Sequence, residues 1–296
     1  MNIFESIKNE FRIPDAYENW SGYRKALTDI IVSHAEKAAT DCSAGGSRSI
    51  AILGAGPCND IDLYRIHETY EKITLIDVDS TGMEAALERY GLGHLPQVKV
   101  KPVSLTGLTD DLTERFFNRL YMYLVEKGRT LTEADFQERT LMEFKAVEDR
   151  LYKSIGDFSE ILPEAGYDTI IAAGLHSQLW SVLSYSWHIL AGNVSEQLLD
   201  GYPVDPEPLH DRIKELDDDM VPLLNEAILR SATGRVILAS EYDTDNPVEG
   251  AWQCINHVRS RQRSQDFNLT ETTLEWPFSP VQNRKYVMLV QDMVRR

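Results

Sequence analysis

Two short motifs in the first half of the chain could bind a nucleoside. Gly54-Ala55-Gly56 directly follows an apolar run, residues 49–53, and Asp77 ends the next apolar run, residues 73–76. The two glycines let the backbone turn sharply after a strand and approach a ligand closely, and the free N–H groups of the next helix then face that ligand. A carboxylate at the tip of the second strand can accept hydrogen bonds from two ribose hydroxyls. Together they predict a site for a nucleoside-bearing cofactor.

The residues that are missing narrow the choice of cofactor. A dinucleotide fingerprint has a third glycine three residues after the second, and here that position is Asn59. Asn59 and Asp60 are poor neighbours for a pyrophosphate but suit an ammonium or a sulfonium group. The phosphate-binding pattern GxxxxGK[ST] is also absent. Asp79 competes with Asp77 for the ribose, and we prefer Asp77 because it directly ends the apolar run.

Strand and helix patterns alternate from residue 48 onward, which predicts a parallel sheet with helices on both faces. The predicted strands cover residues 49–53, 73–77, 98–103, 167–173 and 235–239. The predicted helices cover 59–70, a stretch ending at 90, 177–190 and 208–231. Two further strands, 272–276 and 286–290, have no helix between them and predict an antiparallel hairpin at one edge of the sheet.

Helical additions surround this sheet. We expect an N-terminal helical cap over residues 1–47 and, within a sheet domain spanning 48–296, helical insertions at about 109–160 and 192–230. Apolar side chains recur at helical spacing over 15–41, so this helix packs on the core, or its aromatic end covers a ligand. The additions can enclose a small acceptor and exclude water. Alternatively, one or more of them form a homodimer interface.

With these elements in place, the chain resembles the class I S-adenosylmethionine-dependent methyltransferases. The resemblance depends on Gly54-Ala55-Gly56, on Asp77, on a strand that ends in Ala173-Gly174-Leu175, and on the order of seven strands with a terminal hairpin. It covers residues 48–296 apart from the insertions. It implies an α/β fold: a seven-stranded Rossmann-like methyltransferase sheet with a terminal antiparallel hairpin, plus the N-terminal helix and the helical insertions.

The resemblance also implies roles for individual residues. In this family the first motif cradles the methionine part of S-adenosylmethionine, the acid after strand two holds the ribose, residues after strand three touch the adenine, and the loop after strand four faces the methyl group. The corresponding residues here are Gly54, Ala55 and Gly56 with Asn59, then Asp77, then Ser104 and Leu105, and finally Ala173 and Gly174. The acid that usually follows strand three is absent.

The segment after strand four supplies the catalytic candidates. Methyl transfer is a direct displacement, so a base is needed only when the acceptor arrives protonated. His176 could take that proton, or it is a helix-start histidine with a structural hydrogen bond. Gln178 could orient the acceptor, or it is a solvated first-turn residue. Glu241 and Tyr242, after strand five, lie on the same edge and could also face the acceptor.

Composition limits the partners and the cellular site. The chain has 30 Lys and Arg against 47 Asp and Glu, a formal charge of −17, which opposes binding to nucleic acid. There is neither an apolar run long enough to span a membrane nor a signal-peptide pattern, so we expect a cytoplasmic protein. Cys42, Cys58 and Cys254 are expected to be reduced thiols. Three adjacent acids, residues 217–219, point in different directions on a helix, so we expect no metal site.

The sequence therefore predicts an S-adenosylmethionine-dependent methyltransferase that methylates nitrogen or oxygen of a small molecule. Much of the negative charge lies in the additions, which favours a neutral or cationic acceptor. One alternative is a transferase that uses the aminopropyl or aminocarboxypropyl arm of the same cofactor. Another is a noncatalytic Rossmann-like scaffold whose helices bind a protein partner.

Overall fold

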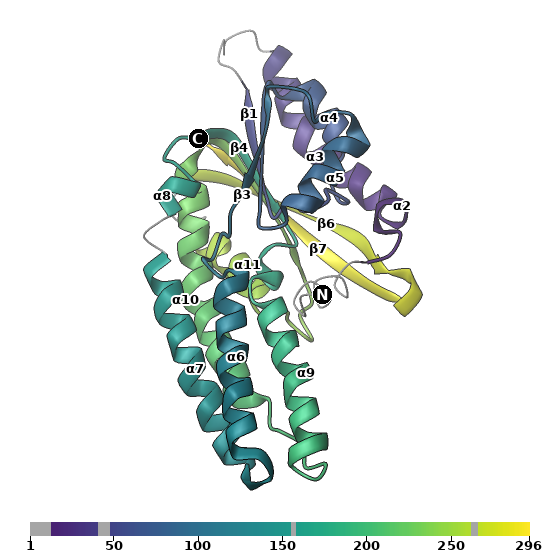
Figure 1. The fold of residues 1–296 in the computed structure, drawn as a ribbon. Coiled ribbons are helices and arrows are strands. Elements are labelled where there is room, and N and C mark those ends of the chain that lie inside the picture. Colours follow the sequence, from purple (N-terminus) through teal and green to yellow (C-terminus); the bar gives the residue numbers. More distant parts are fainter. Residues whose placement is uncertain (1–12, 41–47, 155–157, 262–265) are drawn as a thin grey trace.

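A mostly parallel sheet is the centre of the structure. This computed structural model describes residues 13–40, 48–154, 158–261 and 266–296, so Cys42 and part of the predicted N-terminal cap lie outside the described residues. The described strands are β1 Ser49–Leu53, β2 Lys72–Asp77, β3 Val98–Pro102, β4 Tyr167–Ala173, β5 Ala232–Glu241, β6 Phe267–Ser279 and β7 Arg284–Arg295. They form one seven-stranded sheet in the order β3-β2-β1-β4-β5-β7-β6 (Figure 1). The first five strands are parallel and β7 is antiparallel to both neighbours, so the predicted fold class and terminal hairpin are confirmed.

The central strands are apolar on both faces because helices cover both faces. In β1, Ile50 and Ile52 belong to one buried cluster, and Ala51 and Leu53 belong to another on the opposite face. This alternation follows from the two-residue period of a strand. It explains why the run of residues 49–53 is continuously apolar.

Helices pack on both sides of the sheet. On one side lie α3 Ser21–Thr40, α4 Leu63–Thr69 and α5 Ser80–Tyr90. On the other lie α8 Phe158–Ile161, α10 Glu207–Ser231 and α11 Ala251–Arg261 (Figure 1). Local signals set the ends of α5, since the Asp79 side chain accepts from the Gly82 N–H and Gly91 takes the left-handed conformation that ends the helix.

Long helices form a second layer that projects away from the sheet (Figure 1). These are α6 Asp110–Lys127, α7 Glu133–Ser154, α9 Ser181–Leu198 and the first half of α10. They bury their own apolar cluster, which includes Phe136, Phe144 and Trp187. Within residues 109–160, the described residues include α6, α7 and the first residues of α8. Within α10 the roles divide, because Leu216 packs in this bundle whereas Ile228 packs under the sheet.

Some boundaries differ from the prediction. The predicted helix over 15–41 consists of α2 Ala16–Asn19 and α3, with Trp20 between them, and residue 41 lies outside the described residues. The remaining short turns are η1 Gly128–Thr130, η3 His176–Gln178 and η5 Pro280–Gln282. Helix α11 was not predicted, and β6 and β7 are longer than expected. Within the described ranges, no helix combines the length and the apolar character needed to cross a bilayer.

Candidate functional site

The glycine turn and the tip of β2 are joined by hydrogen bonds. Gly54 and Gly56 both adopt positive φ, at 65° and 43°, which favours glycine at each position. The Gly54 N–H donates to the Ile76 carbonyl at 2.9 Å, and the Gly56 N–H donates to Oδ2 of Asp77 at 2.9 Å. The two sequence motifs therefore form one local structure, with the acid directly beside the turn.

The carboxylate of Asp77 keeps capacity for further donors. Its Oδ1 accepts from the Asp79 N–H at 2.7 Å, and two carboxylate oxygens can accept about four hydrogen bonds in all. Burial raises the pKa of Asp77 above its ordinary value, although the backbone N–H groups of Asp79, Gly56 and Val78 act in the opposite sense. A partly desolvated carboxylate of this kind gains from additional donors such as hydroxyl groups.

Asp79, the competing acid, is occupied by its own helix. Its Oδ1 accepts from the Gly82 N–H at 2.9 Å, which is the usual bond of a residue that caps a helix N-terminus. This hydrogen bond of Asp79 to its own helix favours Asp77 as the acid that would hold the ribose.

Two arginines hold the segment that follows the glycine turn. Arg24 donates to the Asn59 carbonyl at 3.0 Å, and Arg89 donates to the Asn59 side-chain oxygen at 3.1 Å. The two guanidinium groups lie 3.8 and 4.2 Å from the centre of the Tyr17 ring. Burial raises the pKa of neighbouring Asp60 to about 6. Asn59 therefore contributes to the shape of the turn through both its backbone and its side chain.

The residues after β3 lie against the tip of β2. The Val103 N–H donates to the Asp77 carbonyl at 3.0 Å. Ser104 and Leu105, the next two residues, therefore follow directly from this contact with Asp77. Leu105 is buried, and Ser104 is half-buried with its hydroxyl 3.3 Å from that of Thr106. The structure thus brings the predicted adenine contacts and the predicted ribose acid to the same edge of the sheet.

The end of β4 lies next to the glycine turn. A Cβ added to Gly54 would approach Leu175 Cδ1 to 3.0 Å, and one added to Gly174 would lie 3.6 Å from both Gln178 Nε2 and Trp276. Ala173 is half-buried, whereas Gln178 is exposed. Leu175, the residue after Gly174, therefore contacts the glycine turn. The Gln178 amide and the Trp276 indole lie against Gly174 itself.

His176 is the catalytic candidate that the geometry favours least. Its side chain is 2% exposed, and Nε2 lies 2.9 Å from the side-chain oxygen of Asn225 in α10. Burial lowers the pKa of His176 to about 4, so the ring is neutral at physiological pH. These contacts favour the structural role and point the ring into the core between η3 and α10 rather than toward an acceptor.

A structural His176 predicts a particular pH dependence of stability. The folded-state pKa of about 4 lies below the ordinary value of 6.5, so the unfolded chain binds the extra proton between these values and stability is lost as the pH falls. For His176→Gln, which cannot titrate, we expect the free energy of unfolding relative to the parent protein to rise by about 2 kcal/mol from pH 7.5 to pH 5. Urea unfolding of both proteins at the two pH values measures this, and a constant difference would contradict the assignment.

Glu241 is buried at the end of β5, on the same edge. Its Oε1 accepts from the Ser177 hydroxyl at 2.8 Å, and burial raises its pKa. Tyr242, by contrast, turns toward α11, where its ring stacks 6.2 Å from that of Trp252. Only Glu241 of this pair therefore remains beside the end of β4.

Two aromatic residues that the sequence did not place at the site complete this edge. Tyr23 in α3 stacks on Trp276 in β6 with ring centres 5.6 Å apart, and Trp20 meets the same indole edge-on at 4.8 Å. The aromatic spacing of the N-terminal helix was the only signal for this contact, and it was also compatible with simple core packing.

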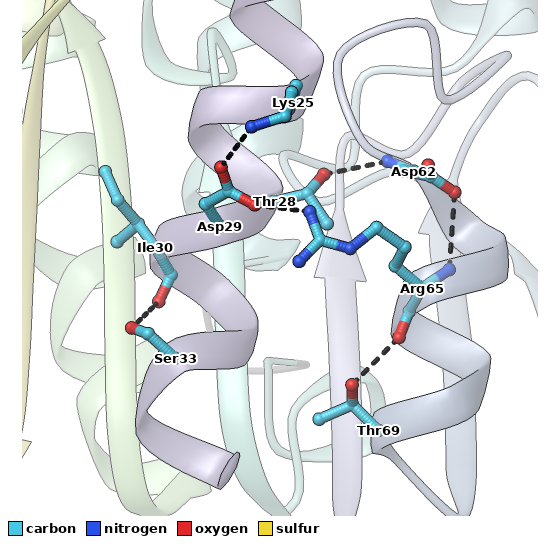
Figure 2. A network of polar contacts seen from close by, with 8 residues as sticks. All are labelled: Lys25, Thr28, Asp29, Ile30, Ser33, Asp62, Arg65 and Thr69. Carbon is cyan, nitrogen blue, oxygen red and sulfur yellow. Dashed lines mark hydrogen bonds and ion pairs between the residues drawn. The ribbon is translucent and has the colours of Figure 1, made fainter. Parts of the chain in front are cut away.

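A polar network fixes α3 and thereby these aromatic residues (Figure 2). Asp29 accepts from Lys25 and forms an ion pair with Arg65 in α4. The Asp62 N–H donates to the Thr28 hydroxyl at 3.0 Å, while the Asp62 side chain caps α4. Lys25, Asp29, Asp62 and Arg65 all line one surface hollow. The ion pair of Asp29 with Arg65 and the Thr28–Asp62 hydrogen bond join α3 to the start of α4.

The acidic run in α10 does not converge on a common point. Asp217 accepts from the Trp180 indole, Asp218 from Gln253 and Asp219 from Tyr152. Across the described ranges no cluster of three His, Cys, Asp or Glu side chains could hold a metal ion. The three acids thus help to join α10 to its neighbours.

The strand order and antiparallel β7 define a Rossmann-like sheet of the kind found in class I S-adenosylmethionine-dependent methyltransferases. Comparison with solved structures finds methyltransferases at low sequence identity and with TM-scores below 0.5. The magnesium protoporphyrin IX methyltransferase ChlM of Synechocystis PCC 6803, with bound S-adenosylmethionine, is 11% identical with a TM-score of 0.44 over 99% of this chain and 89% of that one. The N-methyltransferase NodS of Bradyrhizobium japonicum WM9, in complex with S-adenosylhomocysteine, is 10% identical with a TM-score of 0.43 over 100% and 99%.

A methyltransferase of Aquifex aeolicus is 11% identical with a TM-score of 0.39 over 98% of each chain. No protein-family profile matches the chain, and no curated protein matches it in sequence. At such low identities and TM-scores the likeness concerns the fold alone. The functional argument therefore depends on the site residues of this chain.

Proposed function

We propose that the protein is an S-adenosylmethionine-dependent methyltransferase that methylates nitrogen or oxygen of a small-molecule acceptor. The observation that carries this proposal is the carboxylate of Asp77, which lies at the tip of β2 within hydrogen-bond distance of the Gly56 N–H and has acceptor capacity left. An acid in this place beside a glycine turn suits a ribose with two free hydroxyls.

The glycine turn fits the remainder of the cofactor. A Cβ on Gly56 would lie 3.9 Å from Asp77 Oδ2, so the missing side chain leaves the carboxylate open on this side. In the proposal, Gly54 to Gly56 hold the methionine portion, Asp77 holds the ribose, and Ser104 and Leu105 contact the adenine. When bound, S-adenosylmethionine supplies an electrophilic methyl group on a sulfonium.

The ends of β4 and β5 supply the acceptor side. Gly174, Gln178 and Glu241 come from these ends, and the bundle helices α6 and α9 follow β3 and β4 on the same edge. Residues at this edge can orient an acceptor and exclude water from it. Helices beside the edge favour a small molecule over a large polymer.

Calorimetry with S-adenosylmethionine and S-adenosylhomocysteine tests the proposal. We expect both to bind with one site per chain. NAD is the matched control, because Asn59 stands where a dinucleotide site needs glycine, and we expect no binding of NAD. Absence of binding by both adenosyl compounds at millimolar concentration would refute the proposed function.

A further inference from the structure

Besides His176 Nδ1 and Ser240 Oγ, three buried polar atoms near the end of β4 have no hydrogen-bond partner in the part of the chain that the structure describes. They are the Tyr23 hydroxyl, Oε2 of Glu241 and Nε1 of Trp276. The three residues are 3%, 6% and 4% exposed, respectively, so bulk water is not a ready partner for these atoms. Because buried polar groups are nearly always hydrogen-bonded, the Tyr23 hydroxyl and Oε2 of Glu241, which can both accept, indicate a ligand that supplies donors. The Trp276 N–H can only donate, so such a ligand does not pair with it.

The three residues surround the same short segment. Trp276 stacks with Tyr23 at 5.6 Å and lies against Gly174, where an added Cβ would be 3.6 Å from the indole ring. Glu241 is tied to that segment through the Ser177 hydroxyl at 2.8 Å. Burial raises the pKa of Tyr23, and the negative charges of Asp60 and Glu241 add to this effect.

The chemistry of this cluster favours a cation. Glu241 is a buried carboxylate that accepts from a neutral hydroxyl, that of Ser177, and from its own backbone N–H. An unpaired buried carboxylate is costly, and a bound positive group removes that cost. The electron-rich rings of Tyr23 and Trp276 also attract cations. A group with several N–H donors and a positive charge would suit both features.

We propose that Glu241, Tyr23 and Trp276 bind the amino group of the methyl acceptor in its ammonium form, so that the substrate is a small primary or secondary amine. Oε2 of Glu241 takes the proton that the ammonium must lose before its nitrogen can attack the methyl group. This inference rests on the proposed function, because it assigns the acceptor of the same site. Glu241 accepts N–H bonds at Oε2, the Tyr23 hydroxyl accepts another, and the aromatic rings exclude water. Glu241 and Tyr23 are thus the residues that select an amine over an uncharged acceptor.

The test measures binding, with n-butylammonium as the probe and n-butanol as its uncharged counterpart of similar shape. Saturation-transfer NMR titrations use protein saturated with S-adenosylhomocysteine. We expect n-butylammonium to bind, and we expect the affinity for n-butanol to be lower by at least about tenfold. Equal binding of the two compounds, or no binding of n-butylammonium to the saturated protein, would overturn the inference.

Glu241→Gln tests the residue itself. It keeps the shape of the side chain and an oxygen for the Ser177 hydroxyl, so we expect the fold to persist and n-butylammonium binding to fall about tenfold or more. The matched control is Glu275→Gln, which makes the same charge change at an exposed position next to Trp276 and should leave binding unchanged. Equal loss in both variants would show a general charge effect and contradict the proposal.

The affinity for S-adenosylhomocysteine distinguishes a failure of the proposed amine site from a failure of the proposed function. We expect Glu241→Gln to retain it within about threefold, because Asp77 and the glycine turn hold that ligand. A loss of cofactor affinity equal to the loss of amine affinity would place Glu241 in the cofactor site and overturn the inference. Failure of the parent protein to bind S-adenosylhomocysteine would instead refute the proposed function.

Discussion

Replacing Asp77 with alanine is expected to weaken the binding of S-adenosylhomocysteine by about 100-fold, because two hydrogen bonds from ribose hydroxyls to a charged acceptor are lost, at about 1.5 kcal/mol each. The same substitution removes the acceptor of the Gly56 N–H and loosens the glycine turn. Calorimetry with purified variant and parent proteins measures the change. Unchanged affinity would show that Asp77 is not the ribose acid.

Asp79→Asn is the matched control for this experiment. Asparagine caps helices as well as aspartate does, so α5 should keep its N-terminal hydrogen bond to the Gly82 N–H while the charge disappears. We expect cofactor affinity to remain within about threefold of the parent value. A large loss in Asp79→Asn together with a small loss in Asp77→Ala would reverse the two roles.

The central strands could be predicted from the sequence because their signal is local. The run 49–53 is apolar at each position after Ser49, and burial on both faces of the sheet requires that. Helix α11 also carried a local signal, since Ala251, Cys254, Ile255 and Val258 recur at three- and four-residue spacing and are all buried. The helix is only 11 residues long and ends in a cluster of arginines, which was not assigned to a helix from the sequence.

The arrangement of the site could be predicted only in part. The glycine turn and Asp77 are joined by one βα unit, whose geometry is nearly constant, so their proximity followed from spacing. Tyr23 and Trp276 lie at opposite ends of the chain and meet only because α3 packs against β6. The contact of His176 could not be predicted for the same reason. Its hydrogen-bond partner, Asn225, lies in α10 and comes close only when α10 packs against the segment after β4. Long-range packing of this kind leaves no periodic trace in the sequence.

The close approach of α11 to the segment after β4 predicts the largest effect on stability. Gly250 precedes α11 with φ at +35°, and a Cβ there would lie 2.1 Å from the His176 carbonyl oxygen and 2.8 Å from its carbon. Both contacts are with backbone, so no side-chain rotation can relieve them. We expect Gly250→Ala to lower the free energy of unfolding by about 3 kcal/mol or more, from left-handed strain and overpacking together. Urea denaturation measures this change.

Gly192→Ala is the control with the opposite expected sign. Gly192 lies exposed within α9, and a Cβ there would meet no atom within 4 Å. Within a helix, alanine is more stable than glycine by about 1 kcal/mol, so this variant should be more stable than the parent protein. Because both substitutions add one methyl group to a glycine, their difference contains the left-handed strain and the His176 contact at Gly250 together with the helix gain at Gly192. Equal effects of the two variants would show that α11 can move away from the β4 segment without cost, and the segment carrying Gly174, Ser177 and Gln178 would then lack the rigid support inferred here.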